Sequence, residues 1–340
     1  MKYFKLILIL VVIILLLAIF FKDANFGKVF NEIKNINPIY PILFIIGIFI
    51  NMIVRSYRWG LIIKQYKKKI SLKTLINFTA IGFFINFLPG RVGEIARGIL
   101  IARKEKINQS YGLASVIIER LIDVLMIVIL FLVSLSFIRD NNTPFMMNLK
   151  KISYFMLPII LFVFLLFYFI NSKKIFSYVE KSICFLAKII PHKFREKAVN
   201  FTLNFIKGLR LNLRFIDFLK LFLSSLLVWI VLIPFYWVLM KGFDINISLF
   251  ETIPFFSITV IAAAIPTPGM AGSLDAGAKL GLIALFKVSE STAVAYTLVF
   301  HFLILLLITV FGLISLWMQG LNFKMIKNIK DKKNEMPSLQ

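Results

Sequence analysis

Long runs of apolar residues, separated by short basic stretches, dominate the hydrophobic pattern of the chain. The first run extends from Leu6 to Phe21, behind the basic start MKYFK. Six further regions have the pattern of complete or interrupted apolar helices: Ile39–Val54, Leu72–Ala102, Ser110–Phe137, Ile152–Ile170, Phe215–Met240 and Leu249–Trp317. Runs of about 17–25 apolar residues are long enough to cross a bilayer as helices. The pattern therefore predicts an all-α polytopic membrane protein.

The first run has two interpretations, a cleaved signal peptide or an uncleaved signal-anchor helix. A cleaved signal peptide ends in a site of small residues, and no small-x-small sequence follows Phe21. We therefore expect a signal-anchor helix.

Two of the apolar regions are interrupted by proline and glycine. Leu72–Leu88 is followed by PGRVG, and Leu249–Ile265 is followed by PTPGMAG. Proline removes a backbone donor and glycine permits tight turns, so each motif is expected to break its helix. The segments after the breaks, Glu94–Ala102 and Ser273–Phe286, are too short to span comfortably, which predicts two helical hairpins. The residues expected to shape the hairpin tips are Pro89, Gly90, Gly93, Pro266, Pro268, Gly269 and Gly272.

The distribution of basic residues favours one of two topologies. If every apolar segment crosses the membrane, lysine and arginine are nearly equal in number on the two sides. If both interrupted regions are re-entrant hairpins that enter and leave on one side, the side that holds the N-terminus carries a large excess. Cytoplasmic loops are enriched in these residues, so the second topology is favoured. It predicts about six full transmembrane helices and two re-entrant hairpins, in the cell membrane with both termini cytoplasmic.

In this topology the two hairpins enter from opposite faces, and each lies between two spans. Residues 38–137 and 215–317 then form an inverted repeat, as in transporters whose broken helices meet near the middle of the membrane. Chance is the alternative, because the shared pattern Pro-Gly-x-x-Gly is short. Residues 1–322 are expected to form one transmembrane domain with an amphipathic cytoplasmic connection at 171–214, followed by a basic cytoplasmic tail at 323–340.

The composition supports the membrane class. The chain is 60% hydrophobic and has a net charge of +24. Such a charge can indicate nucleic-acid binding, but here the basic residues lie in patches between apolar runs, which is typical of cytoplasmic loops. The single cysteine, Cys184, excludes an internal disulfide, and the two histidines, His192 and His301, are far apart. We expect no metal site, no cofactor and no nucleic-acid partner.

Charged residues inside apolar segments are the main candidates for function. Each costs about 2.5–3.5 kcal/mol at the centre of a membrane helix, so such groups pair or face an aqueous cavity. After the first break, Arg91, Glu94 and Arg97 are three residues apart, so that Glu94 can reach both arginines. The N-terminus of the helix that follows the break also favours anions. Two arginines in this position predict a phosphate site.

A second charged group, Glu119, Arg120 and Asp123, lies in the next apolar segment. Glu119 and Asp123 are four residues apart and share a helix face. The alternative to a binding role is an internal salt-bridge cluster that fixes helix packing and binds nothing.

The remaining charged residues in apolar segments have simpler interpretations. Asp275 and Lys279 are four residues apart in the second hairpin and are expected to pair. His301 is expected to be a packed polar group rather than a proton carrier. Arg55 and Arg58 end the second apolar segment, where anchoring at the membrane interface explains them as well as a function does.

The chain contains no motif of a catalytic site. The sequences GxSxG and HExxH, a phosphate-binding loop and Gly-rich nucleotide signatures are all absent. No polar segment is long enough for a soluble catalytic domain, so a transporter-like protein rather than an enzyme is expected.

Four segments carry a family resemblance: RSYRW at 55–59, NFLPGRVGEIARG at 86–98, ASVIIERLIDVL at 114–125 and IPTPGMAGSLDAG at 265–277. Together they resemble the lysylphosphatidylglycerol synthetase transmembrane-region family, over nearly the whole chain. The resemblance implies a flippase-like region, which in the bacterial namesakes is fused to a soluble aminoacyl-transferase domain. That synthetase half is expected to be missing here.

Position by position, the resemblance implies a set of residues that bind a lipid headgroup. They are Arg91, Glu94, Arg97, Glu119, Arg120, Asp123 and Asp275. The chain departs from the family pattern at Met270 and Asp275, and near His301, where the family commonly has arginine. The resemblance therefore does not assign lysyl-phosphatidylglycerol as the substrate.

Together these observations predict a lipid translocase for membrane lipids with anionic or polar headgroups. The first alternative is a non-catalytic accessory membrane subunit that presents lipid substrate to a separate lipid-modifying transferase. A membrane-embedded enzyme is the second alternative.

Overall fold

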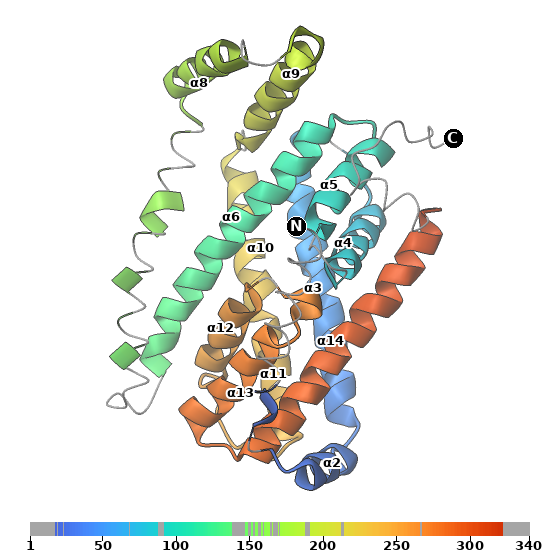
Figure 1. Cartoon of the computed structure of the whole chain (residues 1–340), viewed down its shortest axis with the longest axis vertical. Helices are drawn as coiled ribbons and strands as arrows, with labels where there is room; N and C mark the ends of the chain where they lie inside the picture. Colours follow the sequence, from blue (N-terminus) through green and yellow to red (C-terminus); the bar gives the residue numbers. More distant parts are fainter. Residues whose placement is uncertain are drawn as a thin grey trace.

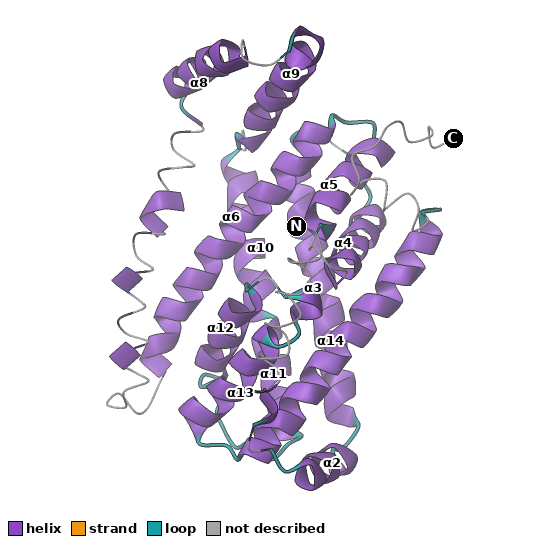
Figure 2. Cartoon of the chain, viewed as in Figure 1, coloured by secondary structure: helices purple, strands orange, loops and turns teal. Residues whose placement is uncertain are grey.

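The structure is a computed structural model. It describes residues 24–67, 69–87, 92–137, 171–187, 191–211, 214–265 and 267–321, with scattered positions in 18–22 and 147–169. This part of the chain forms twelve α-helices and short 3₁₀ turns, and it contains no strand (Figure 2). The all-α prediction is confirmed. The expected signal-anchor helix, most of the expected span at 152–170 and the basic tail lie outside the described residues.

Three helical stretches of the described chain are long and apolar enough to cross a membrane. They are α3 (Ile39–Ile63), the consecutive helices α10 (Phe215–Ile230) and α11 (Leu232–Lys241), and α14 (Glu290–Met318). Helix α6 (Gln109–Ser134) has a similar length of 26 residues, but three charged residues lie in its middle. Helix α3 packs against α6, α10, α11 and α14, so it lies at the centre of the bundle (Figure 1).

The first interrupted region forms two helices that pack on each other, α4 (Leu72–Phe87) and α5 (Gly93–Lys104). The expected tip residues Pro89 and Gly90, together with Arg91, lie outside the described residues. At the start of α5, the Gly93 N–H donates to Oδ1 of Asn86 across 2.9 Å. This bond ties the first turn of α5 back to the end of α4.

The second interrupted region forms α12 (Thr252–Ala263), the 3₁₀ turn η3 (Pro268–Met270) and α13 (Ser273–Phe286). Gly269 has a φ of 61° and Gly272 a φ of 81°, backbone conformations that glycine adopts without steric cost. Met270 also has a positive φ, 59°. Proline and glycine thus break the helix where the sequence predicts, although Pro266 itself lies outside the described residues.

The two halves of the chain use corresponding packing partners. In the first half α4 packs on α5, and α5 packs on α6; in the second, α12 packs on α13, and α13 packs on α14. The contacts between the halves also correspond. The first helix of each hairpin packs on the long helix that follows the other hairpin: α4 packs on α14, and α12 packs on α6 (Figure 1).

The tip of the second hairpin lies against α4 of the first. The turn η3 packs on α4, and Gly269 lies beside the ring of Phe87, the last residue of α4. A side chain at Gly269 would place its Cβ 3.5 Å from that ring. The end of α4 and the second break are therefore neighbours in space, although nearly two hundred residues separate them along the chain.

The connection between the halves forms two helices, α8 (Lys173–Leu186) and α9 (His192–Leu209). Helix α9 packs on α6, and the Tyr66 hydroxyl donates to the carbonyl of Gly208. Large apolar side chains of α8, including Tyr178 and Phe185, are exposed. At the other end of the bundle, the short helix α2 (Phe26–Asn35) packs on α14 (Figure 1).

Candidate functional site

Two arginines of α3 lie inside the bundle. The helix continues to Ile63, so Arg55 and Arg58 are interior positions of a long helix rather than its end. Arg58 has no exposed surface, and Arg55 is 7% exposed. Anchoring at a water interface cannot account for a fully buried guanidinium group, so that interpretation of the two residues is wrong.

Their partners are two carboxylates on one face of α6. Arg58 donates from Nη1 to Asp123 Oδ1 across 2.6 Å and from Nη2 to Glu119 Oε1 across 2.9 Å. Arg55 donates from Nη1 to the second oxygen of Asp123 across 3.1 Å. Because Glu119 and Asp123 are one helical turn apart, one arginine reaches both.

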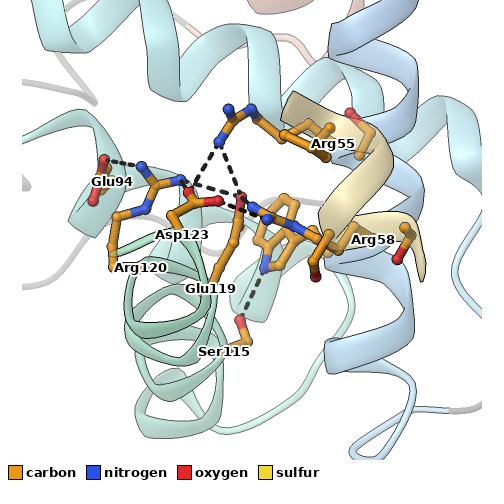
Figure 3. Close-up of polar contacts among 12 residues, drawn as sticks. Arg55, Arg58, Glu94, Ser115, Glu119, Arg120 and Asp123 are labelled. Carbon is orange, nitrogen blue, oxygen red and sulfur yellow. Dashed lines mark hydrogen bonds and ion pairs between the residues drawn. The ribbon is translucent and has the colours of Figure 1, made fainter. Parts of the chain in front are cut away.

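The first hairpin contributes a third buried arginine. Arg97 on α5 is 1% exposed, and its Nη2 donates to the second oxygen of Glu119 across 2.7 Å. Its guanidinium group lies over the ring of Trp59, 4.7 Å from the centroid. The indole N–H of Trp59 donates in turn to Ser115 of α6 across 3.0 Å (Figure 3). Helices α3, α5 and α6 are thereby joined through one group of side chains.

Arg120 and Glu94 form the more exposed edge of the network. The side chains of Arg120 and Glu94 are 32% and 31% exposed, and they form an ion pair of 3.3 Å. Arg120 also pairs with Asp123 across 2.9 Å and with Glu119 across 3.2 Å. Figure 3 shows this edge on the side of the network away from α3. The network is therefore closed toward α3 and partly open beside the first hairpin.

Positive charge is in excess among the described residues of the network. Its four arginines face three carboxylates. Nη1 of Arg97 is buried and has no hydrogen-bond partner within the described chain. A surplus cation in a low-dielectric environment favours an anion nearby.

Glycines bring the helices of this region close together. A Cβ at Gly82 of α4 would lie 2.7 Å from Cδ of Arg97. A Cβ at Gly98 of α5 would lie 2.9 Å from the carbonyl oxygen of Gly112 on α6. Because neither glycine carries a side chain, α4 and α6 can pack closely around Arg97. A larger residue at Gly98 would push α5 away from α6.

A second polar cluster joins the tip of the other hairpin to α14. Nδ1 of His301 lies 2.6 Å from Oδ1 of Asp275, and Nε2 lies 2.9 Å from the carbonyl oxygen of Gly269. Oδ2 of Asp275 accepts from the Gly272 N–H across 2.8 Å, at the start of α13. Asp275 and His301 are 4% and 8% exposed.

The expected pair of Asp275 and Lys279 is not formed. Lys279 pairs instead with Glu290 of α14 across 2.6 Å and donates to the backbone carbonyls of Phe20 and Lys22. The spacing of four residues along one helix suggested the pair. Instead, Asp275 binds His301 of α14, while Lys279 binds Glu290 of α14 and the two backbone carbonyls near the start of the chain.

The structure thus brings together five of the seven headgroup residues expected from the sequence: Glu94, Arg97, Glu119, Arg120 and Asp123. Within this set the expected pair of Glu94 with Arg97 is replaced by the pairs Glu94–Arg120 and Arg97–Glu119. Asp275 belongs to the second cluster, and Arg91 lies outside the described residues.

Arg55 and Arg58 are the network residues that sequence reasoning missed. Their spacing of three residues places them on one face of α3, and two charges on one face of an apolar helix already indicate a shared partner.

No group of three or more His, Cys, Asp or Glu side chains within the described residues could hold a metal ion. The network instead suits an anion with several acceptor oxygens, because guanidinium groups donate in pairs to such groups.

The family model described as Lysylphosphatidylglycerol synthase TM region matches residues 6–312. No curated protein and no solved structure matches the chain. The matched residues include both hairpins, the arginine–carboxylate network and the cluster at His301.

Proposed function

Because the chain belongs to the lysylphosphatidylglycerol synthase TM region family, we propose that it is a translocase for membrane lipids with anionic or polar headgroups. Membership of this family indicates a membrane protein associated with lipid modification. The step from there to lipid movement rests on the arginine–carboxylate network.

The observation that carries the proposal is the excess of arginine in a bundle of apolar helices. Each charge costs about 2.5–3.5 kcal/mol at the centre of a membrane helix. A cluster that served packing alone would gain most from balanced charges, since an unmatched buried cation is destabilising. A lipid phosphate at the exposed edge would balance the surplus.

We assign different roles to the members of the network. Arg120, at the exposed edge, would hold the phosphate, together with Arg91, which precedes α5 by two residues in the sequence. Arg58 and Arg97 are buried and each binds a carboxylate of α6, so they would hold Glu119 and Asp123 in place rather than contact the lipid. Glu94 would compete with the phosphate for Arg120 and so limit how tightly the lipid binds.

The proposal includes a membrane topology. The long apolar helices would cross the cell membrane, and the two hairpins would be re-entrant from opposite faces, with both termini in the cytoplasm. The corresponding contacts of the two halves support an inverted repeat of residues 38–137 and 215–317. Transporters with this symmetry place their substrate sites where broken helices meet. Here that place is the contact between Gly269 and Phe87.

The test is the movement of a fluorescent phosphatidylglycerol between leaflets in liposomes that contain only the purified protein. We expect movement with wild-type protein and at least a tenfold loss with Arg120→Met, because hydrogen bonds to charged groups contribute about 1.5–3 kcal/mol. Arg214→Met is the matched control, since the Arg214 side chain is 81% exposed and lies outside the network. Equal rates for Arg120→Met and wild type would contradict the proposed site.

The second candidate is an accessory subunit that presents lipid to a separate transferase. The family description, which names a synthase, favours it. In that case the purified protein would bind phosphatidylglycerol but would not move it between leaflets, and Arg120→Met would weaken binding alone.

A further inference from the structure

His301 lies between two oxygen atoms of the second hairpin. Its Nε2 faces the backbone carbonyl of Gly269 across 2.9 Å, and its Nδ1 faces the carboxyl group of Asp275 across 2.6 Å. Both side chains are more than nine-tenths buried. Both distances are those of hydrogen bonds, so a hydrogen lies in each contact.

The two contacts together fix the number of protons. A carbonyl oxygen only accepts, so Nε2 must carry a hydrogen, and a neutral imidazole then has a bare lone pair at Nδ1. A bare Nδ1 would repel an ionised carboxylate at 2.6 Å. Both hydrogen bonds can therefore form together only if the pair holds one proton more than a neutral histidine with an ionised aspartate, located between Nδ1 and Oδ1.

This extra proton holds the hairpin tip on α14. Asp275 accepts the Gly272 N–H with its other oxygen, at the start of α13, and Gly269 is the middle residue of the turn η3. His301 is thus bonded directly to the turn and, through Asp275, to the start of α13. When the proton leaves, the neutral ring has a single N–H and can keep only one of the two bonds.

We propose that the Asp275–His301 pair is the binding site of a coupling proton, whose release frees the tip of the second hairpin from α14. The inference rests on the proposed lipid movement and supplies its energy source. The proton passes between the pair and water, and no other bond is made or broken.

The contact between the second hairpin tip and α4 links this proton to the lipid site. The turn that His301 holds packs on α4, beside Phe87. Helix α4 in turn packs on α5, which carries Glu94 and Arg97. A movement of the turn η3 would therefore shift α4, and through α4 it would reach α5, which contributes Glu94 and Arg97 to the arginine–carboxylate network.

The other half offers a comparison. Arg120 and His301 each lie twelve residues after the N-cap of their helix, Asn108 and Ser289. Each binds an acidic side chain from the hairpin just before it in the chain. Arginine stays protonated at all accessible pH values, whereas histidine releases its proton in the physiological range unless its environment prevents it. Only the second half can therefore exchange a proton at this position.

Charged and titratable groups on the elements that pack against α14 set the field at His301. In the described chain they are Asp275 and Lys279 on α13, Lys28, Glu32 and Lys34 on α2, Arg55, Arg58, Tyr40 and Tyr57 on α3, Lys73 on α4, and Tyr236 and Lys241 on α11. Helix α14 itself adds Glu290 and Tyr296. Lys279 is paired with Glu290, about 16 Å from His301 along the helix. Arg55 and Arg58 are paired with Asp123. Asp275 is the one carboxylate in contact with the imidazole within the described residues.

The proton can be observed without any transport assay. The chain has two histidines, so ¹⁵N-histidine labelling of a His192→Gln variant in liposomes reports His301 alone. We expect N–H signals from both ring nitrogens near neutral pH, and conversion of the ring to the neutral form by Asp275→Asn. The carboxyl carbon of ¹³C-labelled aspartate reports the other possible location of the proton, on Asp275. A bare Nδ1 together with an ionised Asp275 carboxylate, in the protein without the Asp275 substitution, would overturn the inference.

Coupling is tested by a pH gradient across liposomes that contain fluorescent phosphatidylglycerol. With one proton per lipid, a gradient of one pH unit shifts the ratio of lipid between leaflets by about tenfold. His301→Arg, which keeps a cation but cannot release it, should remove the response to the gradient. Lipid movement by wild-type protein that ignores the gradient would overturn the coupling. A complete absence of lipid movement would contradict the proposed function instead, and the proton site would still be decided by the nitrogen signals.

Discussion

Arg58 and Glu119 form an ion pair of 2.9 Å in which neither side chain has any exposed surface. Glu119 also receives Arg97, at 2.7 Å, so a single carboxylate stands between two buried guanidinium groups from different helices. Burial of such a pair costs desolvation free energy. Removal of one partner costs more stability still, because it leaves a buried charge without a counter-ion.

Replacement of the central carboxylate should therefore destabilise the fold. We expect Glu119→Gln to lower the free energy of unfolding by about 3–5 kcal/mol, since Arg58 and Arg97 lose their shared partner. Thermal unfolding in detergent measures the effect. The control is Glu105→Gln, which breaks a pair with the partly exposed Lys67 and should cost at most about 1 kcal/mol. Similar losses in the two variants would show that the network is not a stabilising unit.

The charges of the first hairpin should separate folding from function. The double variant Arg91→Met with Glu94→Leu removes one positive and one negative charge, so we expect it to fold and to lose lipid movement. Arg91→Lys should retain partial activity, because lysine keeps the charge but loses the bidentate geometry of the guanidinium group. Leaflet exchange in liposomes and the unfolding temperature are measured on the same preparations. Full lipid movement by the double variant would show that these charges serve only as scaffold.

Close packing of α5 on α6 should depend on glycine. In Gly98→Ala the added Cβ meets the Gly112 carbonyl oxygen at 2.9 Å, so the helices must move apart. We expect a loss of about 1–3 kcal/mol in unfolding free energy. Gly27→Ala is the control, because this glycine of α2 is exposed and an added Cβ there meets only the Asn25 side-chain oxygen, at 3.3 Å, and no neighbouring helix, so we expect a change of at most about 1 kcal/mol. A neutral Gly98→Ala would mean that this helix contact is looser than described.

The native cysteine reports the topology without mutation. Cys184 lies in α8 and is exposed, so a membrane-impermeant maleimide should label it in inverted vesicles and not in intact cells. In a Cys184→Ser background, Asn142→Cys should give the opposite pattern, because residues 141–148 are expected outside. Labelling of Cys184 from the outside would reject the re-entrant topology, because it would place the connection at 171–214 on the outer side.

Local sequence determined where the helices begin and break. Apolar runs predicted α3, α4, α6 and α12, and the two proline–glycine motifs predicted both interruptions, because each depends only on neighbouring residues. Five charged residues of the arginine–carboxylate network were recognised for the same reason: Glu94, Arg97, Glu119, Arg120 and Asp123. A charge in an apolar run is visible without knowledge of its partner.

The tertiary structure decided which charges are partners. Spacing along a helix suggested Asp275 with Lys279 and Glu94 with Arg97, yet each carboxylate binds a residue from another helix. Local pairs contribute only about 0.2–0.5 kcal/mol on an exposed helix. Buried charges cost far more when unmatched, so the rotation and crossing of packed helices, rather than spacing in the chain, select their partners. The same reason explains why Arg55 and Arg58 resemble interfacial anchors in the sequence and form the closed side of the network in the fold.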